Sequence, residues 1–390
     1  MGQWNEAKIG EIAEVKGGKR IPKGRKLIKE PNSHPYIRIR NLGKTKYMQL
    51  NTDYEYVDEE TQQMIARYIV NQGDILISVV GTIGLVGIVG NTLDKANQTE
   101  NCDKIINIKK VLSEYLYYYL VSSFGQDEIK KGTVGAVQPK LPLKNVKDII
   151  VKYPPIKEQK QIVEILSAID EKIELNETIN NNLGQQAQVI YQQMFIDNAS
   201  PDWTECTLSD IADITMGQSP SGSSYNEDGI GTVFFQGRAE FGFRFPTIRL
   251  FTTEPKRMAY INDTLMSVRA PVGDLNVACT DCCIGRGLAA IHSKNNHQSF
   301  VLYTMFSLKK QLDVFNGEGT VFGSINRNSL KEMPLLIPTS EKLDEFEALV
   351  APMDTAIRNN YDEICRLEQL RDTLLPKLMS GELDVSDIDL

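Results

Sequence analysis

The chain has 390 residues, of which 41% are hydrophobic and 24% charged, so it is long enough for two or three domains with separate cores. It contains no run of about 18 apolar residues and begins without the parts of a signal peptide, which argues against membrane contact and favours a cytoplasmic protein. The net charge of −8 hides a gradient, because residues 1–50 contain twelve Lys or Arg against four Asp or Glu, and residues 341–390 five against thirteen. Phosphate binding needs only a local basic face, so nucleic acid is not excluded.

Residues 1–155 are expected to form a first α+β domain. Residues 36–40 alternate with period two, which predicts a strand that places Arg38 and Arg40 on one face. The other predicted elements are strands at residues 74–80, 85–89 and 105–108 and a helix at residues 114–124.

Basic side chains gather near the start of this domain, among glycines and a proline that indicate a flexible loop. Such a loop can follow a phosphate backbone, and arginine or amide side chains at strand ends can read base edges. A solvated loop without a ligand is the alternative interpretation. The candidate DNA-binding residues of this domain are Lys19, Arg20, Lys23, Arg25, Lys26, Arg38, Arg40, Gln138 and Lys140.

A long helix is expected over residues 156–198. It follows Pro154-Pro155, which favours an extended approach to a helix start. Its apolar residues are spaced alternately four and three, as in a coiled-coil seam, so the helix needs a partner. The seam residues are Ile162, Leu166, Ile169, Ile173, Asn176, Leu183 and Ile190.

Residues 199–338 repeat the first domain and predict a second domain of the same kind. The opening at Trp4 recurs at Trp203, an offset of 199 residues, and the offset has shrunk to 184 at Pro154 and Pro338. Its predicted elements are strands at residues 233–236 and 264–268 and a helix near residues 299–310. Its candidate DNA-binding residues are Gln236, Arg238, Arg244, Arg249, Arg269, Asn326 and Arg327. The last two are expected at places equivalent to those of Gln138 and Lys140.

A second long helix is expected over residues 339–381, followed by an acidic tail at residues 382–390. Adding 184 to the first seam gives a second seam in the same register, in which Asn360 takes the place of Asn176. The two asparagines are candidate register-setting positions. Pro352 and Pro376 lie inside the seam and predict a kink or a cap. The seam residues are Met353, Ile357, Asn360, Ile364, Leu367 and Leu374.

The repeated register predicts one intramolecular coiled coil. The helices are expected to run antiparallel, because each returns to its own domain by a short connection. The expected fold is therefore α+β, with two similar globular domains separated by two long antiparallel helices and related by a pseudo-two-fold duplication.

The sequence contains no convincing active site. Its three histidines have no partnered motif, and Gly43-Lys44-Thr45 lacks the preceding glycine that a phosphate loop requires. Cys279 and Cys282, with His292 and His297 downstream, have the wrong spacing for a zinc finger. We expect no catalytic residue and no metal ligand, and buried or reduced thiols at these cysteines.

Several motifs recur in a fixed order along nearly all 390 residues. They are the openings at Trp4 and Trp203, the elements Gly73–Ser78 and Gly319–Asn326, the helix start Pro154–Gln159 and the ending Leu370–Leu383. Taken together, they resemble the specificity subunits of Type I restriction-modification systems. One departure is Asn262-Asp263 where the first copy has Gly73-Asp74, and it is expected to alter the turn.

The resemblance implies two target-recognition domains, each reading one half of a bipartite DNA sequence, and two helices that act as a ruler. It implies double-stranded DNA, two methylation subunits and two restriction or motor subunits as partners. S-adenosylmethionine, ATP and Mg²⁺ would bind those partner subunits, and this chain would bind no cofactor and catalyse nothing.

A protein-interaction scaffold that does not bind DNA is the alternative. Its acidic helices would hold partners and its domains would serve as adaptors. Composition does not separate the two hypotheses, whereas neighbouring methyltransferase and helicase-nuclease reading frames would favour the DNA-recognition subunit.

Overall fold

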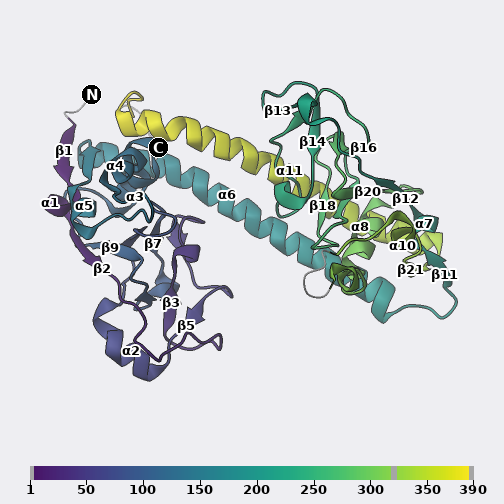
Figure 1. The fold of residues 1–390 in the computed structure, drawn as a ribbon, viewed down its shortest axis with the longest axis horizontal. Coiled ribbons are helices and arrows are strands. Elements are labelled where there is room, and N and C mark those ends of the chain that lie inside the picture. The colour runs from purple at the N-terminus through teal and green to yellow at the C-terminus, as the bar shows by residue number, and fades with distance from the viewer. Residues whose placement is uncertain (1–3, 318–322, 386–390) are drawn as a thin grey trace. The chain divides into compact units, whose positions relative to one another are not determined.

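The computed structural model describes residues 4–317 and 323–385, drawn as a ribbon in Figure 1. The chain divides into two compact units, Met1–Asn176 with Asp362–Leu390, and Glu177–Tyr361. Each unit combines one predicted domain with parts of both long helices. No helix in the described ranges is long and apolar enough to cross a membrane. The domain bounds stay predictions, and residues 386–390 of the predicted tail lie outside the described residues.

The first domain is fastened to its long helix by a two-stranded ribbon. Strand β1 (Asn5–Lys8) pairs antiparallel with β10 (Ile150–Tyr153), which leads through Pro154-Pro155 into the helix. Two further sheets have the strand orders β2-β9-β6-β7-β4 and β5-β3-β8. Their strands are β2 (Glu14–Gly17), β3 (Pro35–Ile37), β4 (Tyr47–Met48), β5 (Glu55–Tyr56), β6 (Ile75–Ser78), β7 (Val86–Val89), β8 (Asn97–Gln98) and β9 (Cys102–Ile106).

Short helices cover these sheets and complete the core. Every residue of β6 and β7 is buried, as their apolar sequences require. The predicted helix at residues 114–124 is divided in two, because Ser122 caps a second helix through Gly125. The helices are α1 (Ile9–Ile12), α2 (Glu59–Ile65), α3 (Ser113–Val121), α4 (Ser123–Gly132) and α5 (Leu143–Asp148).

The second domain repeats this plan. A ribbon of β11 (Thr204–Thr207) and β21 (Pro334–Ile337) is followed by sheets of order β12-β20-β17-β18 and β13-β15-β14-β19-β16. Their strands are β12 (Ala212–Met216), β13 (Tyr225–Asn226), β14 (Thr232–Phe235), β15 (Phe251–Thr252), β16 (Met258–Ala259), β17 (Thr264–Ser267), β18 (Leu275–Val277), β19 (Cys282–Ile284) and β20 (Leu288–Ser293). Its helices are α7 (Leu208–Ile211), α8 (Gln298–Ser307), α9 (Lys309–Leu312) and α10 (Arg327–Lys331).

The duplication extends to individual hydrogen bonds. The hydroxyl of Ser78 donates to the carbonyl of Thr82 at 2.6 Å and accepts from the amide of Leu85 at 2.9 Å. In the second copy, Ser267 donates to the carbonyl of Pro271 at 2.7 Å and accepts from the amide of Asp274 at 2.9 Å. The same serine therefore closes the same loop in both domains.

The expected difference between Gly73-Asp74 and Asn262-Asp263 is absent from the turn. Gly73 has φ +86° and Asn262 has φ +72°, so both occupy the left-handed region, which asparagine tolerates better than other residues with a Cβ. Each following aspartate accepts a backbone N–H, from Asn71 at 2.9 Å and from Tyr260 at 2.8 Å. The expectation that this turn changes was wrong.

The alignment of the two copies at the predicted DNA-binding loops was also wrong. The amide of Leu141 donates to the carbonyl of Val79 at 2.9 Å, and that of Ile325 to Val268 at 3.1 Å. Leu141 and Ile325 are thus equivalent, and the 184-residue offset already holds there. Asn326 consequently corresponds to Pro142 and not to a residue of the Gln138 loop. The predicted motif residues 319–322 lie outside the described residues.

The two long helices are α6 (Ile156–Tyr191, continued by a π-helical turn at Gln192–Asp197) and α11 (Ser340–Ser380). Helix α11 runs without interruption through Pro352 and Pro376, so the prediction that a proline caps it was wrong. Figure 1 shows both helices as long, regular ribbons.

Within each unit the two helices run antiparallel. In the first unit, Arg371 contacts Asp170 at 3.2 Å, and Glu363 accepts from Asn176 at 2.8 Å. In the second unit, Asn360 donates to Asn180 at 2.9 Å. Both predicted polar seam positions therefore hydrogen-bond across the helix pair.

The apolar seam has a middle part and two ends. Ile169, Ile173 and Ile364 form a buried cluster against which Leu367 and Leu374 pack. Ile162 and Leu166 instead join the core of the first domain, since they lie where α6 meets it. In the second unit, Leu183, Ile190, Met353 and Ile357 belong to or pack against the core of the second domain. The predicted seam is buried or half-buried, but only its middle is a contact between helices alone.

Candidate nucleic-acid interface

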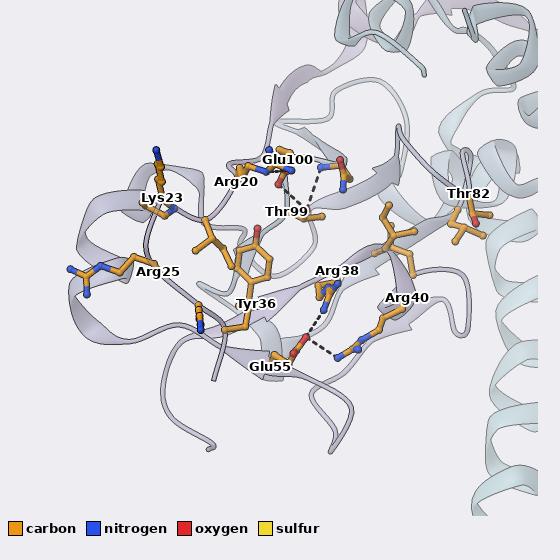
Figure 2. Close-up of a pocket in the computed structure, with 18 of the residues that line it drawn as sticks. Arg20, Lys23, Arg25, Tyr36, Arg38, Arg40, Glu55, Thr82, Thr99 and Glu100 are labelled. Atoms are coloured by element: carbon orange, nitrogen blue, oxygen red, sulfur yellow. Dashed lines mark hydrogen bonds and ion pairs between the residues drawn. The ribbon is translucent and has the colours of Figure 1, made fainter. Parts of the chain in front are cut away.

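A cleft of about 1030 Å³ opens in the first unit between the loop that follows β2 and the segment after β3 (Figure 2). Among the residues lining it are six of the predicted DNA-binding residues. They are Arg20, Lys23, Arg25, Lys26, Arg38 and Arg40. The cleft also contains two carboxylates, Glu55 and Glu100, so its lining carries a surplus of positive charge.

Arg38 and Arg40 converge on one carboxylate. The Nη1 atom of Arg38 lies 2.7 Å, and the Nη2 atom of Arg40 3.0 Å, from Oε2 of Glu55. The predicted strand does not hold them, because β3 ends at Ile37 and Arg40 belongs to a 3₁₀ turn at Ile39–Asn41. The side chain of Asn41 accepts the backbone N–H of Arg38 at 2.8 Å and thereby fixes the turn. The two guanidinium groups therefore come together through the turn after β3 and their shared contact with Glu55, and not through one face of a strand as predicted.

The cations of the loop at residues 19–29 differ in whether a carboxylate pairs with them. Arg20 pairs with Glu100 at 3.0 Å, and Arg25 pairs with Asp58 and Glu60 from the start of α2. Lys23 and Lys26 are exposed and have no ion-pair partner among the described residues. Lys23 and Lys26 therefore keep their ammonium groups available to an anion.

Lys19 borders the cleft. Its carbonyl accepts the hydroxyl of Tyr36 at 3.0 Å, and its ammonium lies 5.8 Å from the ring centre of Tyr68. Burial raises the pKa of Tyr36 to about 12, so this hydroxyl remains a neutral donor that ties the loop to β3.

Gln138 and Lys140 lie at a hairpin near the cleft. Lys140 pairs with Val134 across the hairpin and also with Val80, next to the loop whose Thr82 lines the cleft. Both predicted side chains are exposed. The structure thus places them beside the cleft but not in it.

In the second unit, Gln236 and Arg238 directly follow β14 and are exposed. Arg238 contacts Asp274 at 2.5 Å, and Lys309 contacts the same carboxylate at 3.4 Å. Arg249 pairs with Glu227 at 2.9 Å and with Glu240 at 3.2 Å. These arginines are accessible, and each is held in place by carboxylates.

Three further predicted DNA-binding residues of this domain are Arg269, Asn326 and Arg327. Arg269 is exposed and bridges to Ser324 through its backbone. Asn326 caps α10 by accepting the backbone N–H of Ser329 at 2.9 Å, and Arg327 is the exposed first residue of that helix. The side-chain oxygen of Asn326 thus has a structural role.

Arg244 does not belong to an accessible surface. Its side chain is only 6% exposed, lies 3.6 Å from Asp354 on α11, and stacks near the rings of Tyr303 and Phe306. Lys46 has the equivalent place in the first copy, near the ring of Tyr118. Including Arg244 among the DNA-binding residues was therefore wrong, because the side chain secures the domain to the long helix.

Sequence reasoning missed Tyr36, Glu55 and Glu100 as parts of the cleft. Glu55 lies in an acidic stretch that looks unsuited to DNA, and nothing in the pattern shows that the chain folds back to place it between Arg38 and Arg40. The alternation at residues 36–40 is the signal that could have placed Tyr36 near these arginines.

The cysteine and histidine groups show other arrangements than a metal site. Cys282 and Cys283 are buried in β19, His292 pairs with Asp263 at 2.6 Å, and His297 pairs with Asp344 at 2.9 Å. Over the described ranges, no three residues of types that ligate metals come together. These residues fit a structural role.

A family model described as the Type I restriction modification DNA specificity domain matches residues 1–185 and again residues 201–349. A putative type I restriction enzyme MjaX specificity subunit from Methanocaldococcus jannaschii is 30% identical, over 98% of this chain and 94% of its own length. The HindI specificity subunit from Haemophilus influenzae is 21% identical, over 98% of this chain and 100% of its length.

A solved structure supports the fold. The S subunit of a Type-I restriction-modification system from M. genitalium has a TM-score of 0.63 with 17% identity, over 97% of this chain and 96% of its own. The first matched region begins in the first unit and contains its N-terminal segment, and the second lies within the second unit. The chain therefore belongs to the family of type I restriction enzyme specificity subunits.

Proposed function

We propose that this chain is the DNA-sequence-recognition subunit of a Type I restriction-modification complex, and that each domain reads one half of a bipartite target. The observation that carries the proposal is the cleft of the first domain, whose lining includes six Lys or Arg side chains in a chain that the specificity-domain model matches twice. Lysine and arginine neutralise phosphates and release counterions, which supplies affinity.

Base reading would fall to the side chains at strand ends. Arg38 in the first domain and Gln236 in the second each directly follow the equivalent strand, β3 or β14. Arginine forms a bidentate pair with guanine, and glutamine forms one with adenine. We infer that the two positions contribute to different half-sites.

The long helices would set the distance between half-sites and hold the methylation subunits. Several large apolar side chains on them are exposed, which supports docking of partner proteins. They are Leu175, Ile179, Val189, Leu349 and Leu370. The complex would include two methylation subunits and two restriction or motor subunits, in which S-adenosylmethionine, ATP and Mg²⁺ bind. This chain would have no active site of its own.

The proposal is tested by mapping DNA methylation in the host genome with and without this chain. We expect one bipartite motif to be methylated only when the chain is present. Methylation of the same motif after deletion of the chain would contradict the proposal. If deletion of the chain prevented assembly of the complex, and the intact complex did not bind DNA, the protein scaffold would be favoured instead. The exposed apolar residues of the helices are the observation that supports a scaffold.

A further inference from the structure

The two domains carry equivalent loops, residues 19–29 and residues 218–228. The amide of Lys19 donates to the carbonyl of Gln98 at 3.3 Å, and that of Gln218 to Ile284 at 2.9 Å. Each loop follows a glycine that has no room for a side chain. A Cβ at Gly18 would lie 2.0 Å from the carbonyl oxygen of Thr99, and one at Gly217 would lie 2.1 Å from that of Gly285. The backbone therefore leaves both sheets in the same way.

The chemistry of the two loops is opposite. Residues 19–29 contain six Lys or Arg and no Asp or Glu, whereas residues 218–228 contain no Lys or Arg and two acidic residues. The domains differ in the same sense. Residues 1–155 have 23 basic against 17 acidic residues, and residues 199–338 have 12 against 14.

In the first domain this charge lines the cleft that we propose as the DNA-binding site. Four cations of the loop line the cleft, as Figure 2 shows for Arg20, Lys23 and Arg25. In the second domain, Ser221, Gly222 and Ser223 are exposed at the equivalent places. Those small side chains can make hydrogen bonds but cannot neutralise a phosphate.

We propose that the two recognition domains bind DNA by unequal means, the first through ionic contacts with the phosphate backbone and the second mainly through hydrogen bonds and shape. This inference rests on the proposed function. Each neutralised phosphate adds about 0.9 to the slope of log affinity against log salt concentration. The salt dependence of the whole subunit then originates largely in residues 19–29.

The loss-of-charge variant is Lys23→Gln with Lys26→Gln and Lys29→Gln, three exposed positions. It is expected to lower the magnitude of the salt slope by up to about 2.7, at about 0.9 per phosphate. The matched control is Lys256→Gln with Arg257→Gln and Arg286→Gln, three exposed cations of the second domain. The control is expected to change the slope by less than about 1.

The reciprocal variant adds charge to the second domain. Gly222 has no atom within 4 Å of an added Cβ, so Gly222→Lys with Ser223→Lys introduces two lysines without a clash at Gly222. It is expected to raise the slope by about 2. This gain does not depend on whether the loss-of-charge variant folds.

The experiment uses the full chain assembled with its methylation subunits and a duplex that contains the mapped target. Binding is measured between about 50 and about 200 mM salt. The proposal of unequal ionic contacts would be overturned by either of two results in a complex that still binds its target specifically. One is an unchanged salt slope in the loss-of-charge variant, and the other is an equal decrease of the slope in the control variant. If the proposed function is wrong, the result is different, because the complex then shows no preference for the target duplex at any salt concentration. That result would overturn both the proposed function and the unequal ionic contacts.

Discussion

Tyr118 on α3 donates a hydrogen bond of 2.6 Å from its hydroxyl to the carboxylate of Asp170 on α6. The second copy has the same pair, because Tyr303 on α8 donates to Asp354 on α11 at 2.9 Å. Burial raises the pKa of both tyrosines well above its ordinary value, so the hydroxyls remain donors. Each recognition domain is thus secured to a long helix by the same contact.

Removing this hydroxyl should weaken the attachment. Tyr118→Phe leaves the buried Asp170 with one partner fewer, and we expect a loss of about 1–3 kcal/mol in the free energy of unfolding. Urea denaturation measures it. Tyr260→Phe is the control, since Tyr260 is 58% exposed, and it should change stability by less than about 0.5 kcal/mol. Equal effects of the two changes would argue against the anchoring role.

A substitution at Gly73, in the turn equivalent to that of Asn262, measures the cost of backbone strain without a change in packing. Nothing lies within 4 Å of a Cβ built on Gly73, so a substitution there tests only the left-handed conformation at φ +86°. We expect Gly73→Val to cost about 1–2 kcal/mol and Gly73→Asn clearly less. Thermal denaturation of the two variants side by side checks the order, and a more stable Val variant would refute it.

The duplication, the two helices and their antiparallel pairing could be predicted, because they depend on periodicity and on repeated spacing. The 184-residue offset through Asp170 and Asp354 was visible in the sequence, and both residues hold a tyrosine. The sequence was a poorer guide at Pro352 and Pro376, because α11 runs through both positions and neither proline caps it.

The candidate site was less accessible to sequence reasoning. Charge alone marked Arg244 as a DNA contact, but its burial beside Asp354 depends on how a loop folds onto the long helix. Glu55 was missed because it lies in β5, and only the antiparallel pairing of β5 with β3 brings it to Arg38, which follows β3. Equivalent loops were misaligned around Gln138, because insertions within the domains shift the register there and only hydrogen bonds reveal the true offset.

Arg38 and Glu55 should have opposite effects on DNA binding. Arg38→Gln removes a cation from the cleft and is expected to cost about 1–3 kcal/mol of binding at one half-site only. Glu55→Gln frees Arg38 and Arg40 from a shared negative charge, so affinity for unrelated duplex DNA should increase. Fluorescence anisotropy with target and non-target duplexes measures both.

The matched control for Glu55→Gln is Glu30→Gln, an exposed carboxylate of the same domain. It makes the same change in net charge and should have a clearly smaller effect. If the two variants bind non-target DNA equally, net charge and not the release of the arginines explains the increase.

Asp103 should make stability depend on pH. It is 4% exposed, its Oδ2 atom has no hydrogen-bond partner in the described structure, and burial raises its pKa to about 6. Between about pH 4 and 6 the folded state holds this proton more tightly than the unfolded state, so stability is lost as the pH rises. Above about pH 6 the full cost of the buried charge is present.

Asp103→Asn removes that charge. We expect it to stabilise the protein by about 2–3 kcal/mol at pH 7 and by much less at pH 4.5, from a shift worth about 1.4 kcal/mol per pKa unit. Urea denaturation at both pH values gives the difference. A gain of the same size at both would show that the charge of Asp103 is not its cause.

Matched insertions in the two long helices test whether these helices set the spacing between the two half-sites. Duplicating residues 173–179 in α6 and residues 357–363 in α11 adds one heptad to each helix and preserves the seam. Seven residues lengthen a helix by about 10.5 Å, which corresponds to about three base pairs of DNA. Methylation mapping should then show both half-sites unchanged and a spacer longer by about three base pairs. An unchanged spacer in a complex that still methylates its target would show that the helices do not set the spacing.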